Sequence, residues 1–174
     1  MHRNSAEQFG LDHDNYMGSL VQSNRGHGTW TEFFIQERLV PQVAIAKNHG
    51  LINAILLDQF ETLYTMLDQL CPQEKPALIH GDLWSGNYMI DRMQQPVLID
   101  PAIAYSNREA DLAMTTLFGG FQNSFYEAYN EAYPLQNDWQ NRLDLWNLYP
   151  LLIHLNLFGL SYLSQIKQIL KRYL

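Results

Sequence analysis

Residues 80–87 read HGDLWSGN, and residues 99–102 read IDPA. Short apolar runs flank both stretches, so the polar side chains are expected at strand edges and in loops. Phosphoryl transfer from a nucleotide needs a carboxylate that orients and deprotonates the acceptor hydroxyl, together with oxygen ligands for a metal ion that bridges the phosphates. Asp82 can supply the carboxylate, and Asn87 and Asp100 can supply the ligands. The two stretches therefore indicate a candidate site for phosphoryl transfer.

The residues between these stretches predict a β-hairpin. Two short apolar runs, residues 88–90 and 97–99, are separated by the turn-forming residues 92–95. Because a hairpin returns the chain to its starting edge, it would place Asp100 close to Asn87 despite their separation in sequence. An amide carbonyl and a carboxylate suit a hard, oxygen-preferring cation such as Mg²⁺, with waters and phosphates completing its shell.

Helical periodicity dominates the chain on both sides of this segment. Apolar residues in 52–70 recur every three or four positions, which is typical of an amphipathic helix. The expected helices cover residues 31–48, 52–70, 109–117, 122–132, 138–148, 150–162 and 164–173, and the expected strands cover 77–79, 88–90 and 97–99. The fold class expected from the pattern is mainly α, with a small β-hairpin insert. Residues 1–28 are polar and rich in turn formers, so we expect a loop-rich lead-in there and a folded unit over residues 29–174.

Composition excludes several classes of protein. The chain has 174 residues, a formal net charge of −7 and 47% hydrophobic residues, which is typical of a single globular domain with a sizeable core. The negative charge argues against a nucleic-acid partner, whose phosphates would require clustered Lys and Arg. Cys71 is the one cysteine, so no intramolecular disulfide can form. No apolar stretch resembles a signal peptide or a membrane span, so we expect a cytoplasmic protein without a membrane partner.

The motif resembles that of a known family. The spacing H-x-D-L-x-x-x-N over residues 80–87 matches the catalytic loop of protein-kinase-like enzymes. Trp84 after the Asp-Leu pair, and Asp-Pro-Ala at residues 100–102 in place of Asp-Phe-Gly, resemble the fructosamine kinase (ketosamine kinase) family. The same resemblance extends to LFGGF at residues 117–121 and, upstream, to Asn24 and the residues of the first helix.

The resemblance implies an ATP-dependent kinase that phosphorylates a sugar hydroxyl of ketoamines, the adducts of sugars with amines. Mg²⁺ would be its metal and ATP its co-substrate, and the acceptor would be a ketoamine small molecule or a glycated protein. Asp82 would be the catalytic base, Asn87 and Asp100 the metal ligands, and Trp84 and Asn24 substrate-binding residues.

Three further residues are expected to support the site. In the family that the sequence resembles, His80 would brace the catalytic loop without transferring a proton. Glu109 and Asp111 either fix that loop through hydrogen bonds or act as first-turn acids that favour the helix dipole. The sequence leaves both readings open.

The sequence departs from a complete kinase in one respect. It contains no Gly-rich phosphate-binding loop, and its lysines lie in or beside expected helices. We therefore expect the C-terminal (large) lobe of a protein-kinase-like, aminoglycoside-phosphotransferase-like fold, with the N-terminal β lobe absent. An apolar face left by that lobe would promote self-association.

Two alternative functions follow from the same residues. A kinase-like binding module could keep a metal or ketoamine site without turnover, since the nucleotide clamp is not visible. A metal-dependent hydrolase could use His80, Asp82 and Asp100, although the spacing of Asn87 fits that reading less well.

Overall fold

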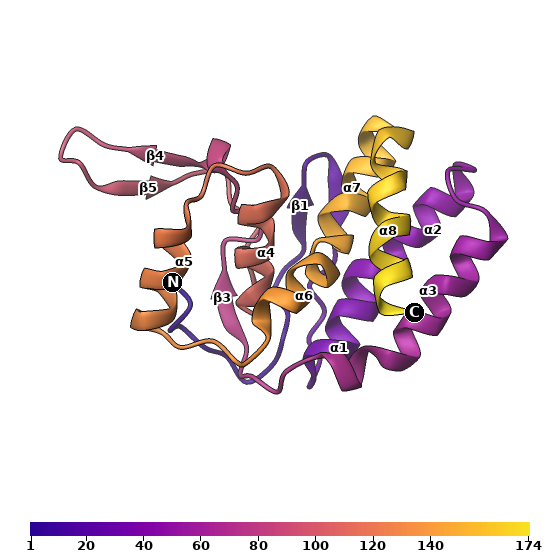
Figure 1. The fold of residues 1–174 in the computed structure, drawn as a ribbon, viewed down its shortest axis with the longest axis horizontal. Helices are drawn as coiled ribbons and strands as arrows, with labels where there is room; N and C mark the ends of the chain where they lie inside the picture. Colours follow the sequence, from indigo (N-terminus) through magenta and orange to yellow (C-terminus); the bar gives the residue numbers. More distant parts are fainter.

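The computed structural model describes residues 1–174, with strands near the start and in the middle of the chain and helices between and after them. The strands are β1 (Asn15–Met17), β2 (Leu20–Gln22), β3 (Ala77–Ile79), β4 (Tyr88–Ile90), β5 (Pro96–Leu98) and β6 (Ala104–Ser106). The α-helices are α1 (Trp30–Phe33), α2 (Val40–Asn48), α3 (Ala54–Leu70), α4 (Glu109–Leu117), α5 (Asn123–Ala132), α6 (Trp139–Trp146), α7 (Leu148–Phe158) and α8 (Leu163–Tyr173). The chain also contains two short 3₁₀ turns, Ser85–Asn87 and Leu160–Tyr162. In Figure 1 the helices α1, α2, α3, α7 and α8 gather at one end of the molecule, and the β4–β5 hairpin projects from the other.

The first expected helix is confirmed, with an irregular centre. α1 and α2 are joined by a π-helical segment, Phe34–Leu39, in which the Val40 amide donates to the Ile35 carbonyl. Pro41 explains the irregularity, because proline has no N–H and its ring would clash with the carbonyl four residues earlier in a regular helix. The wider turn places Glu37 and Arg38 in the interior, where both are buried.

The helical end contains the main hydrophobic core. The buried face of α3 consists of Leu56, Phe60, Leu63 and Leu67, which are four of the six residues of the apolar stripe expected over residues 52–70. Each such side chain stabilises the fold by roughly 1.5–3 kcal/mol when it leaves water. α3 packs against α8, and α7 packs against α2 and α8. None of the helices combines the length and the apolar character required to cross a membrane.

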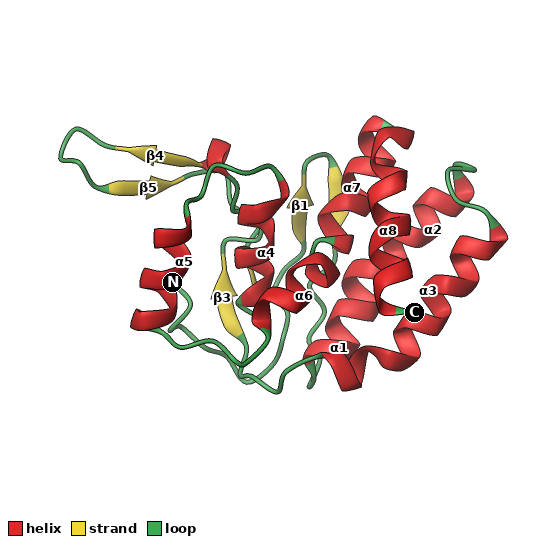
Figure 2. Cartoon of the chain, viewed as in Figure 1, coloured by secondary structure: helices red, strands yellow, loops and turns green.

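The expectation of a single small hairpin insert is wrong. The strands form three separate two-stranded antiparallel sheets, pairing β1 with β2, β3 with β6 and β4 with β5 (Figure 2). The expected strands at residues 77–79, 88–90 and 97–99 are present as β3, β4 and β5, the last displaced by one residue. Sequence analysis missed β1, β2 and β6, because each has three residues and none shows an apolar run long enough to stand out.

Residues 1–28 lie against the rest of the molecule. The β1–β2 hairpin turns at Gly18, whose φ of 59° lies in the left-handed region that glycine adopts without strain. Isolated bridges join Ser5 to Ala77 and Gly10 to Tyr105, so this segment extends the β3–β6 sheet on both strands. The division of the chain at residue 28 stays a prediction.

Candidate active site

The catalytic loop follows β3 and closes on itself through side-chain hydrogen bonds. Asn87 donates from Nδ2 to the Asp82 carbonyl at 2.9 Å and to Asp82 Oδ2 at 3.0 Å. Asn87 is buried, whereas Asp82 is only partly buried. The bonds therefore orient the Asp82 carboxylate while leaving its second oxygen without a protein partner.

Asp82, Asn87 and Asp100 line one cleft of about 400 Å³. The other lining residues come from the β1–β2 turn, the catalytic loop, α4 and α7: Met17, Gly18, Trp84, Met114, Phe118, Ile153, His154, Leu157 and Phe158. No Lys or Arg lines the cleft. The three residues singled out by the motif are therefore brought together as expected.

The β4–β5 hairpin brings Asp100 to the site. Tyr88 pairs with Leu98, and the Ile99 amide donates to the Asn87 carbonyl at 3.1 Å. The next residue, Asp100, has a φ of 54°, which is the left-handed region that Asp tolerates better than most residues. The predicted closeness of Asp100 and Asn87 is confirmed.

Burial raises the pKa of Asp82 above its ordinary value, because the charged carboxylate loses water. The Asp100 carboxylate also raises it, whereas the Asn87 hydrogen bond and the imidazoles of His80 and His154 lower it in part. The net result is a more basic carboxylate than an exposed aspartate. A raised pKa brings a general base closer to neutral pH, where proton transfer is most efficient.

The oxygen ligands fit Mg²⁺. Asn87 Oδ1 accepts no hydrogen bond from the protein, and neither does the exposed Asp100 carboxylate. No group of three or more His, Cys, Asp or Glu side chains could hold a metal ion on its own. Mg²⁺ commonly binds one or two protein oxygens and completes its octahedron with waters and substrate phosphates. Asn87 and Asp100 therefore suit a cation that arrives with a nucleotide.

Asp111 fixes the start of the catalytic loop. Its Oδ2 accepts from the His80 amide at 2.7 Å, and its Oδ1 accepts from the Gly81 amide at 2.8 Å. His2 donates from Nε2 to Asp111 Oδ2 at 2.9 Å and contacts the Tyr129 hydroxyl through Nδ1 at 2.7 Å. The reading of Asp111 as a residue that fixes the loop fits this geometry.

His80, which is buried, contacts both halves of the motif through its ring nitrogens. Its Nε2 donates to the Ile99 carbonyl at 3.0 Å, and its Nδ1 accepts from the Asp82 amide at 3.3 Å. Both ring nitrogens are therefore engaged by the backbone. This geometry suits bracing and leaves no nitrogen for proton transfer.

Glu109 does not touch the catalytic loop. Its fully buried carboxylate accepts from Arg142 through Nε at 2.8 Å and Nη2 at 2.6 Å, and from Trp146 Nε1 at 2.9 Å. Such a paired, hydrogen-bonded charge can be accommodated in the interior. Glu109 therefore ties α4 to α6.

An aromatic wall of Trp84, Phe118 and Phe158 lines the same cleft as the three polar residues. The Trp84 ring lies over Gly86, where a Cβ would stand 2.3 Å from the indole, and it meets Phe118 edge-on at 5.9 Å between ring centroids. The Phe118 ring lies 5.0 Å from the His154 ring, which in turn lies 5.4 Å from Phe158. Trp84 therefore lines the cleft, and its role in substrate binding stays a prediction.

Sequence analysis missed His154 and Phe158. His154 lies on α7, and its Nδ1 donates to the Pro150 carbonyl at 2.7 Å. Nε2 has no protein partner, and the ring lines the cleft. Nothing in the local sequence shows which turn of an apolar helix will face a loop seventy residues away.

Asn24 lies outside the cleft. It is 1% exposed, its Nδ2 donates to the His13 carbonyl and to Asn15 Oδ1, and its Oδ1 accepts from Arg38 Nη2 at 2.7 Å. Both its Nδ2 and its Oδ1 are engaged by the protein, whereas Asn87 Oδ1 and one carboxylate oxygen of Asp82 in the cleft have no protein partner. The structure therefore separates Asn24 from the other residues expected to contact substrate.

Known proteins resemble this chain in sequence and in structure. The fructosamine kinase family model matches residues 1–174. A probable ketoamine kinase of Lactiplantibacillus plantarum is 46% identical over 99% of this chain and 62% of its own length, and one of Enterococcus faecium is 42% identical over 99% and 63%. The protein-ribulosamine 3-kinase of Arabidopsis thaliana chloroplasts is 37% identical over 98% and 52%. The crystal structure of a candidate fructosamine-3-kinase from Thermobifida fusca superposes with a TM-score of 0.93 at 38% identity, over 98% of this chain and 59% of that one.

These matches correct the expectation of one lobe with its N-terminal β lobe absent. The family model takes in the chain from residue 1 to residue 174, and the structural match covers 98% of it, so residues 1–28 belong to the matched unit. The chain spans about three fifths of the length of the first relatives it matches. This chain belongs to the fructosamine kinase family.

Proposed function

We propose that this chain carries the phosphotransfer site of an ATP-dependent kinase that phosphorylates a sugar hydroxyl of ketoamines. The observation that carries the proposal is the meeting of Asp82, Asn87 and Asp100 in one cleft beside an aromatic wall. The names of the relatives, ketoamine kinase and ribulosamine 3-kinase, support the same class of acceptor. The hydrolase alternative leaves the amide of Asn87 without a role.

Asp82 is proposed as the catalytic base. Its free carboxylate oxygen would accept the proton of the acceptor hydroxyl as that oxygen bonds to the γ-phosphorus and the bond from phosphorus to the ADP oxygen breaks. The Asn87 hydrogen bond holds the carboxylate in one orientation, and burial raises its pKa. Positioning of this kind, together with charge stabilisation, accounts for most of the catalysis in phosphoryl transfer.

Asn87 and Asp100 are proposed as the residues that hold Mg²⁺. When bound, the ion would neutralise charge on the transferring phosphates. The cleft contributes no cationic side chain, so the metal is the positive charge nearest to Asp82 that the cleft can offer. Nucleotide binding should therefore depend strongly on Mg²⁺.

The exposed face of the β4–β5 hairpin is proposed as the binding site of the nucleobase. Met89 and Val97 are cross-strand partners and lie on one face, and both are exposed. Ile99 follows in the same alternation and precedes Asp100, so this apolar face continues into the metal site. A flat apolar surface next to phosphate-binding groups suits a purine ring.

The aromatic wall is proposed as the acceptor site. Trp84, Phe118 and Phe158 offer apolar ring faces to the alkyl part of a sugar-amine conjugate, and a protonated amine would be attracted by those faces. His154 Nε2 could accept a hydrogen bond from a sugar hydroxyl, because Nδ1 already donates to Pro150. The acceptor hydroxyl would then lie between this wall and Asp82.

Calorimetric titration tests the nucleotide site. ATP is titrated into the wild-type chain with and without Mg²⁺, and into Asp100→Asn and the exposed control Asp12→Asn. We expect Mg²⁺-dependent binding in the wild type and the control, and weakening by about 10-fold or more in Asp100→Asn, since one charged ligand is lost. Binding that is equal with and without Mg²⁺, or equal in all three proteins, would contradict the proposed metal site.

A binding function without turnover is the second reading, and the absence of Lys and Arg from the cleft favours it. It predicts Mg²⁺ or ketoamine binding without release of ADP. A fructosyl-lysine derivative added to the same titration, followed by an ADP assay, separates the two readings.

A further inference from the structure

A buried polar network joins the β1–β2 hairpin to the segment that follows Asp100. Gln22, 3% exposed, donates from Nε2 to the Ala102 carbonyl at 3.1 Å and to Asn15 Oδ1 at 2.8 Å. Its Oε1 accepts from the Tyr149 hydroxyl at 2.8 Å. The protein therefore supplies the hydrogen bonds that orient the Gln22 amide toward Ala102.

Asn15 holds the next residue of the same segment. Its Nδ2 donates to the Ile103 carbonyl at 2.8 Å. Side chains of β1 and β2 therefore donate to two successive carbonyls, those of Ala102 and Ile103. The Ala102 amide donates on its other side to the His80 carbonyl at 2.9 Å. The backbone just after Asp100 is thus fixed between the catalytic loop and the N-terminal hairpin.

The network ends in a buried cation. Asn24 Nδ2 donates to Asn15 Oδ1 at 3.1 Å, and Arg38 Nη2 donates to Asn24 Oδ1 at 2.7 Å. The Arg38 guanidinium is buried on the π-helical segment and lies 4.4 Å from the centre of the Phe33 ring. Breaking one member would leave buried polar groups unpaired, so the arrangement is expected to be stiff.

Asp100 needs such a restraint. Its left-handed φ of 54° is unfavourable for a residue with a side chain and persists only where the surroundings fix it. Its carboxylate is exposed and has no protein partner, so its direction depends on the backbone on either side. The Ile99 amide secures the preceding side by donating to Asn87, and Gln22 and Asn15 secure the following side.

We propose that Gln22 and Asn15 are positioning residues that hold Asp100 in the orientation that binds the metal. The inference rests on the proposed function of Asp100. It also gives the N-terminal hairpin a second role, since Met17 and Gly18 of the same hairpin line the cleft. The hairpin therefore shapes the acceptor side of the cleft with its turn and the metal side with its polar strands.

The test compares two buried glutamines. Gln22→Leu removes the amide that holds Ala102, whereas Gln42→Leu removes an equally buried amide that accepts from Asn156 at 2.9 Å and touches no residue of the site. Tyr149→Phe removes only the hydroxyl that orients Gln22 and serves where Gln22→Leu fails to fold. Each protein is measured for thermal stability, Mg²⁺ dependence of ADP release, ketoamine KM, and amide hydrogen exchange over residues 99–104.

We expect Gln22→Leu to raise the Mg²⁺ concentration for half-maximal activity by about 10-fold and to lower kcat, while ketoamine KM stays unchanged. Tyr149→Phe should act in the same direction and more weakly, and Gln42→Leu should lose stability without a change in Mg²⁺ dependence. Equal Mg²⁺ dependence in the two Gln→Leu variants would overturn the inference.

Hydrogen exchange separates this inference from the proposed function. If the wild-type chain releases no ADP, the proposed function fails, and faster exchange over residues 99–104 in Gln22→Leu or Tyr149→Phe than in Gln42→Leu would still support the positioning role. Exchange that is equal in all the variants would overturn the positioning role, whatever the activity.

Discussion

At Gly81 the catalytic loop lies so close to the segment after Asp100 that the Cα has room only for a hydrogen atom on that side. Its φ is 82°, and a Cβ built there would stand 2.0 Å from the Ala102 carbonyl oxygen. Only glycine meets both demands, the left-handed backbone and the close approach. The residue type is therefore explained by the packing of the two halves of the site.

Gly81→Ala is expected to destabilise the fold by about 2 kcal/mol or more and to abolish ADP release, since strain and a backbone clash add. Gly50→Ala is the matched control, because Gly50 has a φ of 68° and nothing within 4 Å of a built Cβ. The control should lose only about 1 kcal/mol in denaturant unfolding. Equal losses in the two variants would show that the contact with Ala102 is unimportant.

Asp111→Ala is expected to lower the free energy of unfolding by about 3 kcal/mol, because it leaves the buried His80 and Gly81 amides without an acceptor. Asp144→Ala removes a half-exposed partner of Arg172 and should cost about 1 kcal/mol or less. Urea unfolding followed by circular dichroism measures both. A loss in Asp111→Ala no larger than that in Asp144→Ala would contradict the bracing role.

At the scale of elements, the helices were the most predictable part of the chain. The stripe of α3 has one apolar face and an unambiguous period, and Asn53 caps its first turn. Three-residue strands were predictable where three apolar residues follow one another, as in β3 and β4 and in residues 97–99, which overlap β5. β6 depends on a distant strand through the pairing of Leu78 with Tyr105, which a local pattern cannot reveal, and β1 and β2 form a local hairpin without three consecutive apolar residues in either strand.

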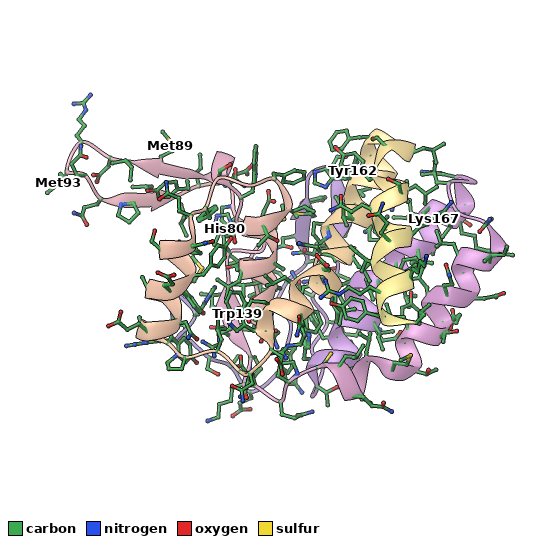
Figure 3. The ribbon with its side chains drawn as sticks, in the orientation of Figure 1. His80, Met89, Met93, Trp139, Tyr162 and Lys167 are labelled. Carbon is green, nitrogen blue, oxygen red and sulfur yellow. The ribbon has the colours of Figure 1, made fainter.

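Two exposed methionines on the β4–β5 hairpin allow a test of the proposed nucleobase-binding site. Met89 is 55% exposed and Met93, at the tip, is 79% exposed, and both point away from the body of the protein in Figure 3. Met89→Ser should weaken Mg²⁺-dependent ATP binding about fivefold, the equivalent of about 1 kcal/mol of apolar contact, without lowering the melting temperature. Met93→Ser should change neither. Equal ATP affinity in Met89→Ser and the wild type would place the nucleobase elsewhere.

At the scale of the whole molecule, several ionisable groups are buried in their neutral forms. Burial raises the pKa of Cys71 to about 12, from an ordinary value of 9.0, and raises the pKa values of Tyr129 and Tyr149 to about 12. Above pH 9 the unfolded chain therefore releases protons that the folded chain retains. The stabilisation that these neutral groups contribute is fully present below about pH 9. It is lost as the pH rises from the pKa values of the unfolded chain toward those of the folded chain.

We expect the loss to reach about 2 kcal/mol or more between pH 9 and about pH 11, measured by denaturant unfolding at each pH. In the folded protein at pH 8, Cys71 should not react with a thiol reagent, and it should react once the chain is unfolded. Stability that is constant up to pH 11, or a thiol that reacts in the folded protein, would contradict the buried environment of these groups.

The site was more predictable than the fold that surrounds it. Asp82, Asn87 and Asp100 lie within one short motif, so a hairpin was enough to bring them together. His154, Phe158, Gln22 and Asn15 reach the site from α7 and from the first two strands, and only the packed structure brings these segments to the motif.

Release of ADP by the Asp82→Asn variant tests the central claim most directly. The wild-type chain, Asp82→Asn and the exposed control Asp12→Asn are assayed with Mg²⁺, ATP and a fructosyl-lysine derivative. We predict ketoamine-dependent release in the wild type and the control, and a rate at least about 100-fold lower in Asp82→Asn, which keeps the shape of the side chain and loses the base. Ketoamine-dependent release at the wild-type rate in Asp82→Asn would show that the carboxylate does not act in the transfer.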